Sequence, residues 1–230
     1  MTKTRPQQQT RSTLLDLWRS VAIFLMVFFH FFFDLDVFQY VQIDFERDLF
    51  WWFLPRIIVF LFLTAVGVSL AIVHHKGFQP SKFWPRFFQI SGFAVAISAM
   101  TYFMFPRNWI YFGTLHCIAI SSLAGLFFVN KPKLSLALGL ILLVPSFFGY
   151  SFPWFIMEHK SMDYIPFFPW FGWVLMGIYA FHQNWHMKFS PNFSQHKVIR
   201  FMGAHSLAIY VLHQPIMYGA IYGFYLISKS

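Results

Sequence analysis

Charged residues are scarce in this sequence. Of its 230 residues, 58% are hydrophobic, 34 are phenylalanine and only 11% carry a charge. A chain with so little polar surface does not fold as an ordinary water-soluble domain. Long apolar runs recur along it, and several approach the length that crosses about 30 Å of hydrocarbon. The composition therefore predicts an integral membrane protein.

Cysteine is nearly absent as well. Cys117 stands alone, so an intrachain disulfide is excluded. No HExxH pattern, cysteine pair or clustered carboxylate set accompanies the histidines in and beside the basic connections, so we expect no metal site. The sequence also lacks a Gly-x-Ser-x-Gly elbow and a phosphate-binding glycine loop. No nucleic-acid-binding module accompanies the net charge of +9. These absences leave histidine acid–base chemistry as the expected chemistry.

The apolar runs predict an all-α, polytopic membrane helical bundle of about seven transmembrane helices. They cover residues 13–34, 49–73, 84–105, 111–129, 134–150, 164–181 and 201–227. No linker long enough to divide domains lies between them. We therefore expect one transmembrane domain over residues 13–230, preceded by a cytoplasmic tail over residues 1–12.

The distribution of charge orients this bundle. Eleven basic residues fall on one side: Lys3, Arg5, Arg11, Lys76, Lys82, Arg86, Lys131, Lys133, Lys188, Lys197 and Arg200. The other side carries seven of the eight acidic residues. By the positive-inside rule, the N-terminus is expected in the cytoplasm and the C-terminus outside.

Two ionisable residues, Arg19 and His30, interrupt the first apolar run. Eleven residues of α-helix rise about 16 Å and complete roughly three turns, so both side chains share one face. Asp16 lies a turn before Arg19, and Asp34 a turn after His30. Arg19 and Asp16 are equally well explained as a snorkelling pair at a helix end. For His30 we favour function, with Asp34 holding the imidazole tautomer, because ionisable groups at membrane depth are usually functional.

Two further histidines are candidates for the same site. His116 is expected near the level of His30, so the two rings would flank one reaction centre. His213 lies near mid-membrane and is followed by Gln214 and Pro215. Because a proline frees a backbone carbonyl one turn earlier, this segment favours a local polar cluster.

Arg56 and Trp170 are expected near the outer end of the bundle. Arg56 is suited to neutralise Asp34 or to bind an anionic acceptor, and pairing with an acid is the favoured alternative. Trp170 lines the outer mouth in one interpretation and is an interface anchor in the other, which we favour.

Five blocks of the sequence resemble, in order, bacterial members of the heparan-alpha-glucosaminide N-acetyltransferase catalytic-domain family. They are DLWRSVAIFLMVFFHFFFDLD, FLPRIIVFLFLTAVGVSL, YFGTLHCIAIS, DYIPFFPWFGWVLMG and GAHSLAIYVLHQPI. The spacing of Arg19 and His30 is also similar to the Arg-x10-His signature of the wider transmembrane acyltransferase superfamily. Ser20 stands where a glycine commonly follows the arginine.

This resemblance implies an acyl-CoA-dependent acetyltransferase (EC 2.3.1 type) of the bacterial cytoplasmic, or inner, membrane. It would move an acetyl group from cytosolic acetyl-CoA to an amine or hydroxyl of a sugar or glycan outside. Arg19 and the basic segments are expected to hold the CoA phosphates. Asp16, His213 and Gln214 are expected to complete the cofactor-binding site.

The resemblance also implies catalytic roles. His30 would be the general base, oriented by Asp34, and His116 would stabilise the oxyanion or help to bind the acceptor. Arg56 and Trp170 are the expected acceptor-binding residues. Direct transfer and an acetyl-histidine intermediate both remain open.

Two alternatives belong to other classes. A b-type haem protein would use His30 with His116 or His213 as axial ligands. A transporter or lipid-binding scaffold would line a path with the same polar residues and perform no chemistry. Membrane lipids are expected partners in every case, nucleic acid is not, and a homodimer is left open.

Overall fold

The computed structural model describes residues 13–185 and 197–229, and within these ranges it contains helices and connections but no strand. The predicted tail over residues 1–12 lies outside the described residues. The elements are α1 (Thr13–Val37), α2 (Leu49–His74), α3 (Pro80–Met104), α4 (Thr114–Gly125), η1 (Leu126–Phe128), α5 (Pro132–Phe147), α6 (Phe167–His182), α8 (Lys197–Ala204) and α9 (Ser206–Lys229). The expectation of an all-α fold is confirmed.

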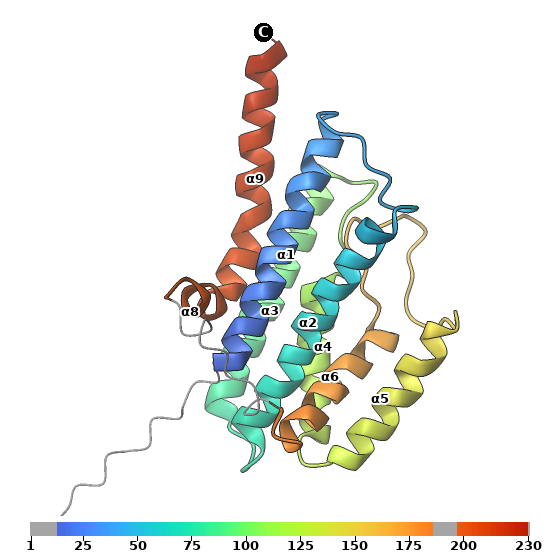
Figure 1. Ribbon diagram of the computed structural model, residues 1–230, viewed down its shortest axis with the longest axis vertical. Coiled ribbons are helices and arrows are strands. Elements are labelled where there is room, and N and C mark those ends of the chain that lie inside the picture. The colour runs from blue at the N-terminus through green and yellow to red at the C-terminus, as the bar shows by residue number, and fades with distance from the viewer. Residues whose placement is uncertain (1–12, 186–196, 230) are drawn as a thin grey trace, which may run out of the picture.

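Successive long helices run in alternating directions (Figure 1). The α2–α3 and η1–α5 connections lie at the end of the molecule where α1 begins, whereas the α1–α2 and α5–α6 connections lie at the other end (Figure 1). The first group carries basic residues such as Lys76 and Lys131, and the second carries acidic residues such as Asp44 and Asp163. The two groups of connections therefore separate as the charge pattern predicts.

Three helices are long and apolar enough to cross a membrane: Leu14–Val37, Leu49–His74 and Pro80–Met104. Thr114–Phe128 and Pro132–Phe147 are apolar but shorter. The described residues therefore do not contain the seven full-length spans that the apolar runs predict. The reason is that residues 106–113 and 148–166 are not helical, so α4 and α6 begin later than the apolar runs suggest. Such irregular backbone is tolerated at membrane depth where it is buried in protein or lines a cavity.

Two other helix boundaries differ from the predicted ones. α3 begins at Pro80, four residues before the predicted residue 84, because proline suits the first helical turn. This places Lys82 inside the helix, together with Arg86. The predicted final helix, residues 201–227, is two helices, α8 and α9, that meet at His205.

α2 packs most closely on α6, through glycines. A Cβ atom on Gly67 would collide with the Val174 carbonyl, and one on Gly177 would collide with the Thr64 carbonyl. Small residues allow helix backbones to approach in this way inside a membrane, where packing rather than the hydrophobic effect holds helices together. The α2–α6 pair is therefore fixed by backbone contact.

α8 packs against the start of α1. The Ser20 hydroxyl is shared between the Asp16 and Ile199 carbonyl oxygens, at 2.7 and 2.6 Å. A Cβ atom on Gly203 would lie 2.6 Å from the Asp16 carbonyl oxygen. Asp16 itself is only 2% exposed. Asp16 and Ser20 thus belong to the α1–α8 junction, and Ser20 joins the two helices through its hydroxyl.

Candidate functional site

Three successive cavities run through the helix bundle. The histidine cavity has a volume of about 490 Å³, and its polar lining includes His30, Arg56, His116, Asp163, His213 and Gln214. The arginine cavity has a volume of about 390 Å³, and its polar lining includes Arg19, Ser69, His74, Lys82, Arg86 and Ser122. The connecting cavity, of about 50 Å³, lies between them.

Shared residues join the three cavities. Arg19, Val66, Arg86 and Ile90 line both the arginine and the connecting cavity. Phe62, Leu115 and Tyr210 line both the connecting and the histidine cavity. Arg19 and His30 therefore face the same line of cavities from one helix, as their eleven-residue spacing predicts.

The histidine cavity contains a pair of imidazoles from α1 and α9. The rings of His30 and His213 are 4.8 Å apart and lie edge to face. Nδ1 of His30 donates to the Met26 carbonyl at 3.0 Å, and Nδ1 of His213 donates to the Tyr210 carbonyl at 2.7 Å. Because a carbonyl only accepts, the proton of each neutral ring lies on Nδ1. Each Nε2 is then free to take a proton.

Asp34 has a different partner from the one expected. Its Oδ1 accepts a hydrogen bond from the Gln214 amide at 2.7 Å, and the residue is only 1% exposed. The Met26 carbonyl, rather than Asp34, fixes the tautomer of His30. Asp34 instead ties the outer part of α1 to α9 and positions Gln214 beside His213.

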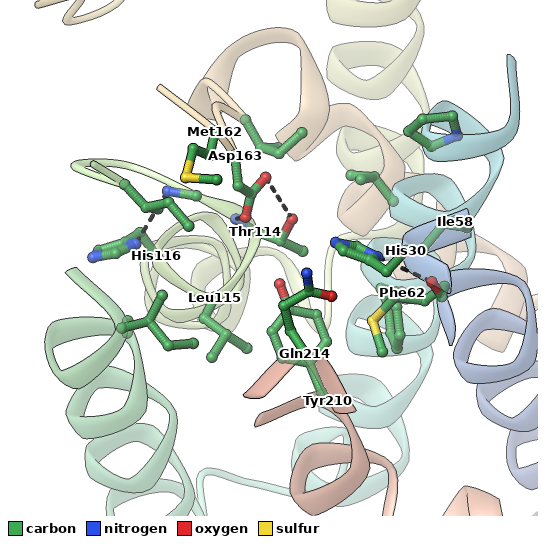
Figure 2. Close-up of a pocket in the computed structure, with 18 of the residues that line it drawn as sticks. His30, Ile58, Phe62, Thr114, Leu115, His116, Met162, Asp163, Tyr210 and Gln214 are labelled. Carbon is green, nitrogen blue, oxygen red and sulfur yellow. Dashed lines mark hydrogen bonds between the residues drawn. The ribbon is translucent and has the colours of Figure 1, made fainter. Parts of the chain in front are cut away.

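His116 is held by the local backbone at the start of α4. Its Nδ1 accepts from the Gly113 N–H at 3.1 Å, and its Nε2 lies 3.2 Å from the Ser98 hydroxyl, which donates to the Ile110 carbonyl. His30 and His116 lie on opposite sides of Thr114 (Figure 2). With both ring nitrogens engaged, His116 is placed to shape the cavity wall rather than to stabilise an oxyanion.

Arg56 and Trp170 both line the histidine cavity. The Arg56 guanidinium lies over the Trp52 ring, 3.4 Å from its centroid, and donates to the Trp52 carbonyl. This stacking replaces the expected pairing of Arg56 with Asp34. It is a cation–π contact, which leaves Arg56 at the edge of the cavity.

The arginine cavity gathers cations from two helices. Arg19 comes from α1 and donates to the Ser69 hydroxyl at 2.6 Å, while Lys82 and Arg86 come from the first two turns of α3. Both residues belong to the basic segments that were expected to hold the CoA phosphates, but neither was singled out as a residue of this cavity. Pro80, which begins the helix early, is the signal that places Lys82 on α3. Three cations around one cavity suit a ligand with several phosphates.

Asp163 is a second residue that sequence reasoning missed. Its carboxylate accepts from the Thr114 N–H at 2.8 Å and from the Thr114 hydroxyl at 3.2 Å. Burial raises the pKa of Asp163, and the two hydrogen bonds from Thr114 oppose that rise. The signal in the sequence was an acid directly before the apolar block that becomes α6.

Within residues 13–185 and 197–229, no group of three or more His, Cys, Asp or Glu side chains is placed to hold a metal ion. The His30 and His213 rings contact each other directly, so the haem alternative requires these two side chains to separate. His116 already uses both ring nitrogens.

The fold and the site define a class: all-helical membrane proteins whose interior joins a cationic cavity to a cavity lined by histidines. Comparison with known families is more specific. The family model for heparan-alpha-glucosaminide N-acetyltransferase, catalytic, matches residues 11–215, and the chain belongs to this family. None of the curated proteins compared, and none of the solved structures, matches it. Membership implies a membrane acetyltransferase, with acetyl-CoA as the implied donor and a glycan as the implied acceptor.

Proposed function

We propose that this protein transfers an acetyl group from acetyl-CoA to an amine or hydroxyl of a sugar or glycan bound in the histidine cavity. The observation that carries this proposal is the line of cavities, with cations at one end and two available imidazole nitrogens at the other. The basic connections lie at the arginine-cavity end, so this end faces the cytoplasm and the acceptor binds outside.

Donor binding begins in the arginine cavity. Arg19, Lys82 and Arg86 bind the nucleotide phosphates, and the pantetheine arm runs toward His30, about 16 Å along α1. The connecting cavity, at about 50 Å³, holds little more than one or two water molecules. Phe62 and Tyr210, whose rings are 5.8 Å apart, must therefore rotate to admit the arm.

Transfer takes place in the histidine cavity. Nε2 of His30 accepts a proton from the acceptor as its nitrogen or oxygen attacks the thioester carbonyl. The bond between carbon and sulfur then breaks, and the CoA thiolate leaves and is protonated. Gln214 keeps a second amide N–H for the oxyanion, since only one is used by Asp34. In a two-step variant, the same His30 Nε2 attacks the thioester first.

A direct assay tests the proposal. Purified protein is incubated with labelled acetyl-CoA and a panel of amino sugars and neutral sugars, and acetylated product is measured by mass spectrometry. We expect saturable transfer that falls about 10²- to 10⁴-fold in His30→Ala, because a positioned general base contributes that much. His205→Ala, at the α8–α9 junction and in none of the three cavities, is the matched control. Equal turnover by His30→Ala and wild type would remove His30 from the mechanism.

Binding separates the enzyme from a transporter or scaffold. The enzyme binds acetyl-CoA saturably, and Arg19→Ala weakens this binding. Folded protein that neither binds acetyl-CoA nor transfers its acetyl group to any acceptor in the panel would refute the proposed function.

A further inference from the structure

The histidine cavity has an apolar side that the proposed mechanism does not use. Ala94, Ile97 and Met100 line the cavity from α3, and residues three apart are neighbours on a helix surface. Val211 and Pro215 line it from α9, four residues apart. The side chains of these five residues are apolar, and we call them together the α3–α9 wall. Such a wall suits a hydrocarbon group, because a polar group placed against it would lose its hydrogen bonds to water.

The α3–α9 wall leads from the interior of the bundle to its surface. Ala94 is 2% exposed, whereas Met100 is 42% exposed and Pro215 is exposed as well. Because three residues fall short of a full helical turn, the row on α3 drifts around the helix from a buried to an exposed position. From Ala94 to Met100 the helix rises about 9 Å, roughly the length of an extended eight-carbon chain. The histidine cavity thus reaches the surface between α3 and α9.

This opening lies at membrane depth. α3 is one of the helices that are long and apolar enough to cross a membrane. Phe103 and Ile216, beside the opening on α3 and α9, are 82% and 64% exposed. Farther out, the rings of Phe105 and Tyr218 lie 6.3 Å apart, edge to face, and bridge the space between the two helices. An opening at this depth, bordered by apolar side chains, meets lipid chains rather than water.

We propose that this protein also transfers medium-chain acyl groups from acyl-CoA, and that the α3–α9 wall binds their hydrocarbon chain. This inference rests on the proposed function and extends its donor from acetyl-CoA to longer acyl-CoA. The nucleotide and the pantetheine arm bind as they do for acetyl-CoA. The thioester carbonyl lies next to His30 and Gln214, which both point into the centre of the cavity (Figure 2). The chain then continues along the wall toward Met100.

The rest of the cavity lining explains why the wall fits the donor better than the acceptor. Arg56, Asp163 and Trp170 line the same cavity and offer a guanidinium, a carboxylate and an indole N–H. A sugar, with hydroxyls around its ring, forms hydrogen bonds with groups of this kind. Against the α3–α9 wall the same hydroxyls would be buried without partners. An acetyl group ends in a single methyl group, so it leaves most of the wall uncovered, whereas a longer chain covers it.

Transfer of a longer acyl group follows the same steps as acetyl transfer. The acceptor nitrogen or oxygen forms a bond to the thioester carbonyl carbon, and His30 takes up the acceptor proton. The bond between that carbon and sulfur breaks, and the CoA thiolate leaves and is protonated. The products are free CoA and a sugar that carries a hydrocarbon chain. Because this chain already lies in the opening between α3 and α9, the product leaves sideways into the membrane.

Binding to the wild-type protein gives the first test. Calorimetry without an acceptor measures the Kd of acetyl-CoA, butyryl-CoA and octanoyl-CoA. Each buried methylene group contributes about three- to fourfold in affinity, so butyryl-CoA should bind about tenfold more tightly than acetyl-CoA, and octanoyl-CoA more tightly again. Equal Kd values for the three donors, or weaker binding of the longer ones, would overturn the proposal, because the wall would then contact only membrane lipid. This measurement needs neither turnover nor a variant.

Ile97→Trp fills the middle of the wall and gives the second test. It should remove most of the gain in affinity from acetyl-CoA to octanoyl-CoA, while the Kd for acetyl-CoA stays nearly unchanged. Val95→Trp is the matched control, because Val95 is 65% exposed on the same helix and lines none of the three cavities. An undiminished gain in Ile97→Trp would show that the chain binds elsewhere. Met100→Trp, at the exposed end of the wall, should weaken octanoyl-CoA binding alone and provides the same test if Ile97→Trp does not fold.

Transfer assays separate failure of this inference from failure of the proposed function. Octanoyl and acetyl transfer to the same panel of sugars are measured by mass spectrometry. We expect both, with kcat/KM lowered for octanoyl-CoA but not for acetyl-CoA in Ile97→Trp. Acetyl transfer without octanoyl transfer would overturn this inference and leave the proposed function standing. Chain-length-dependent binding that Ile97→Trp abolishes, in a protein that transfers neither group, would refute the proposed function and leave only the acyl-binding wall standing.

Discussion

Replacing Arg86 by glutamine should weaken acetyl-CoA binding without changing the chemistry. Arg86 lies in the second turn of α3 and lines both the arginine and the connecting cavity. Glutamine keeps a polar, hydrogen-bonding side chain, although a shorter one, and removes the charge. A hydrogen bond to a charged group contributes about 1.5–3 kcal/mol, and each 1.4 kcal/mol is tenfold in affinity. The KM for acetyl-CoA should therefore rise about 10- to 100-fold, with kcat nearly unchanged.

The decisive comparison uses two donors. S-acetylpantetheine carries the same thioester but has no phosphates, so its KM should be unaffected by Arg86→Gln. Lys133→Gln is the matched control, because Lys133 lies on α5 at the same end of the bundle and lines none of the three cavities. An unchanged KM for acetyl-CoA, or an equal rise for both donors, would show that Arg86 does not bind phosphate.

Three further predictions use other parts of the molecule. Phe62→Trp should obstruct the connecting cavity and lower kcat/KM for acetyl-CoA, while ADP binding in the arginine cavity, measured by calorimetry, stays unchanged. Gly177→Ala places a methyl group against the Thr64 carbonyl and should cost about 1–3 kcal/mol of stability by overpacking, seen as a lower unfolding temperature. In Gly219→Ala the added Cβ meets open space, so equal unfolding temperatures for the two variants would contradict the α2–α6 contact. Burial raises the pKa of Asp163, so the folded protein holds the proton on this carboxyl more tightly than the unfolded chain does. The resulting stabilisation is complete below the unfolded pKa and is lost as pH rises through the folded pKa. Asp163→Asn should remove that part of the pH dependence of the unfolding temperature.

The long helices could be predicted from the sequence because their signal is local. The run from residue 13 to 34 became α1 over Thr13–Val37, and the run from 49 to 73 became α2 over Leu49–His74. Helical periodicity alone placed Arg19 and His30 on one face, and both line the connected cavities. Nothing in these predictions depends on a distant part of the chain.

Helix boundaries next to the site could not be predicted in the same way. Hydrophobicity continues through residues 111–113 and 164–166, yet these segments are not helical. Their polar backbone groups and the Asp163 carboxylate are satisfied by partners from other parts of the chain, such as Thr114 and the Phe112 carbonyl. An apolar run does not reveal which backbone groups will find such partners.

Hydrogen-bond partners between helices could not be predicted from the sequence either. Asp34 stands at helical contact spacing from His30, but its carboxylate bonds to Gln214, 180 residues away. His116 was expected to face the reaction centre, but Gly113 and Ser98 engage its ring. Contact spacing within a helix limits which residues can meet, while neighbouring helices decide which do.

The sequence by itself determined a helical membrane protein, the segregation of its charge and the shared face of Arg19 and His30, because composition and helical periodicity are properties of the chain alone. The tertiary structure decided that His213 joins His30, that Lys82 and Arg86 join Arg19, and that Asp163 enters the histidine cavity. These groupings depend on how α1, α3 and α9 and the non-helical connections pack together. That packing brings residues from opposite ends of the sequence into one cavity, which no local pattern encodes.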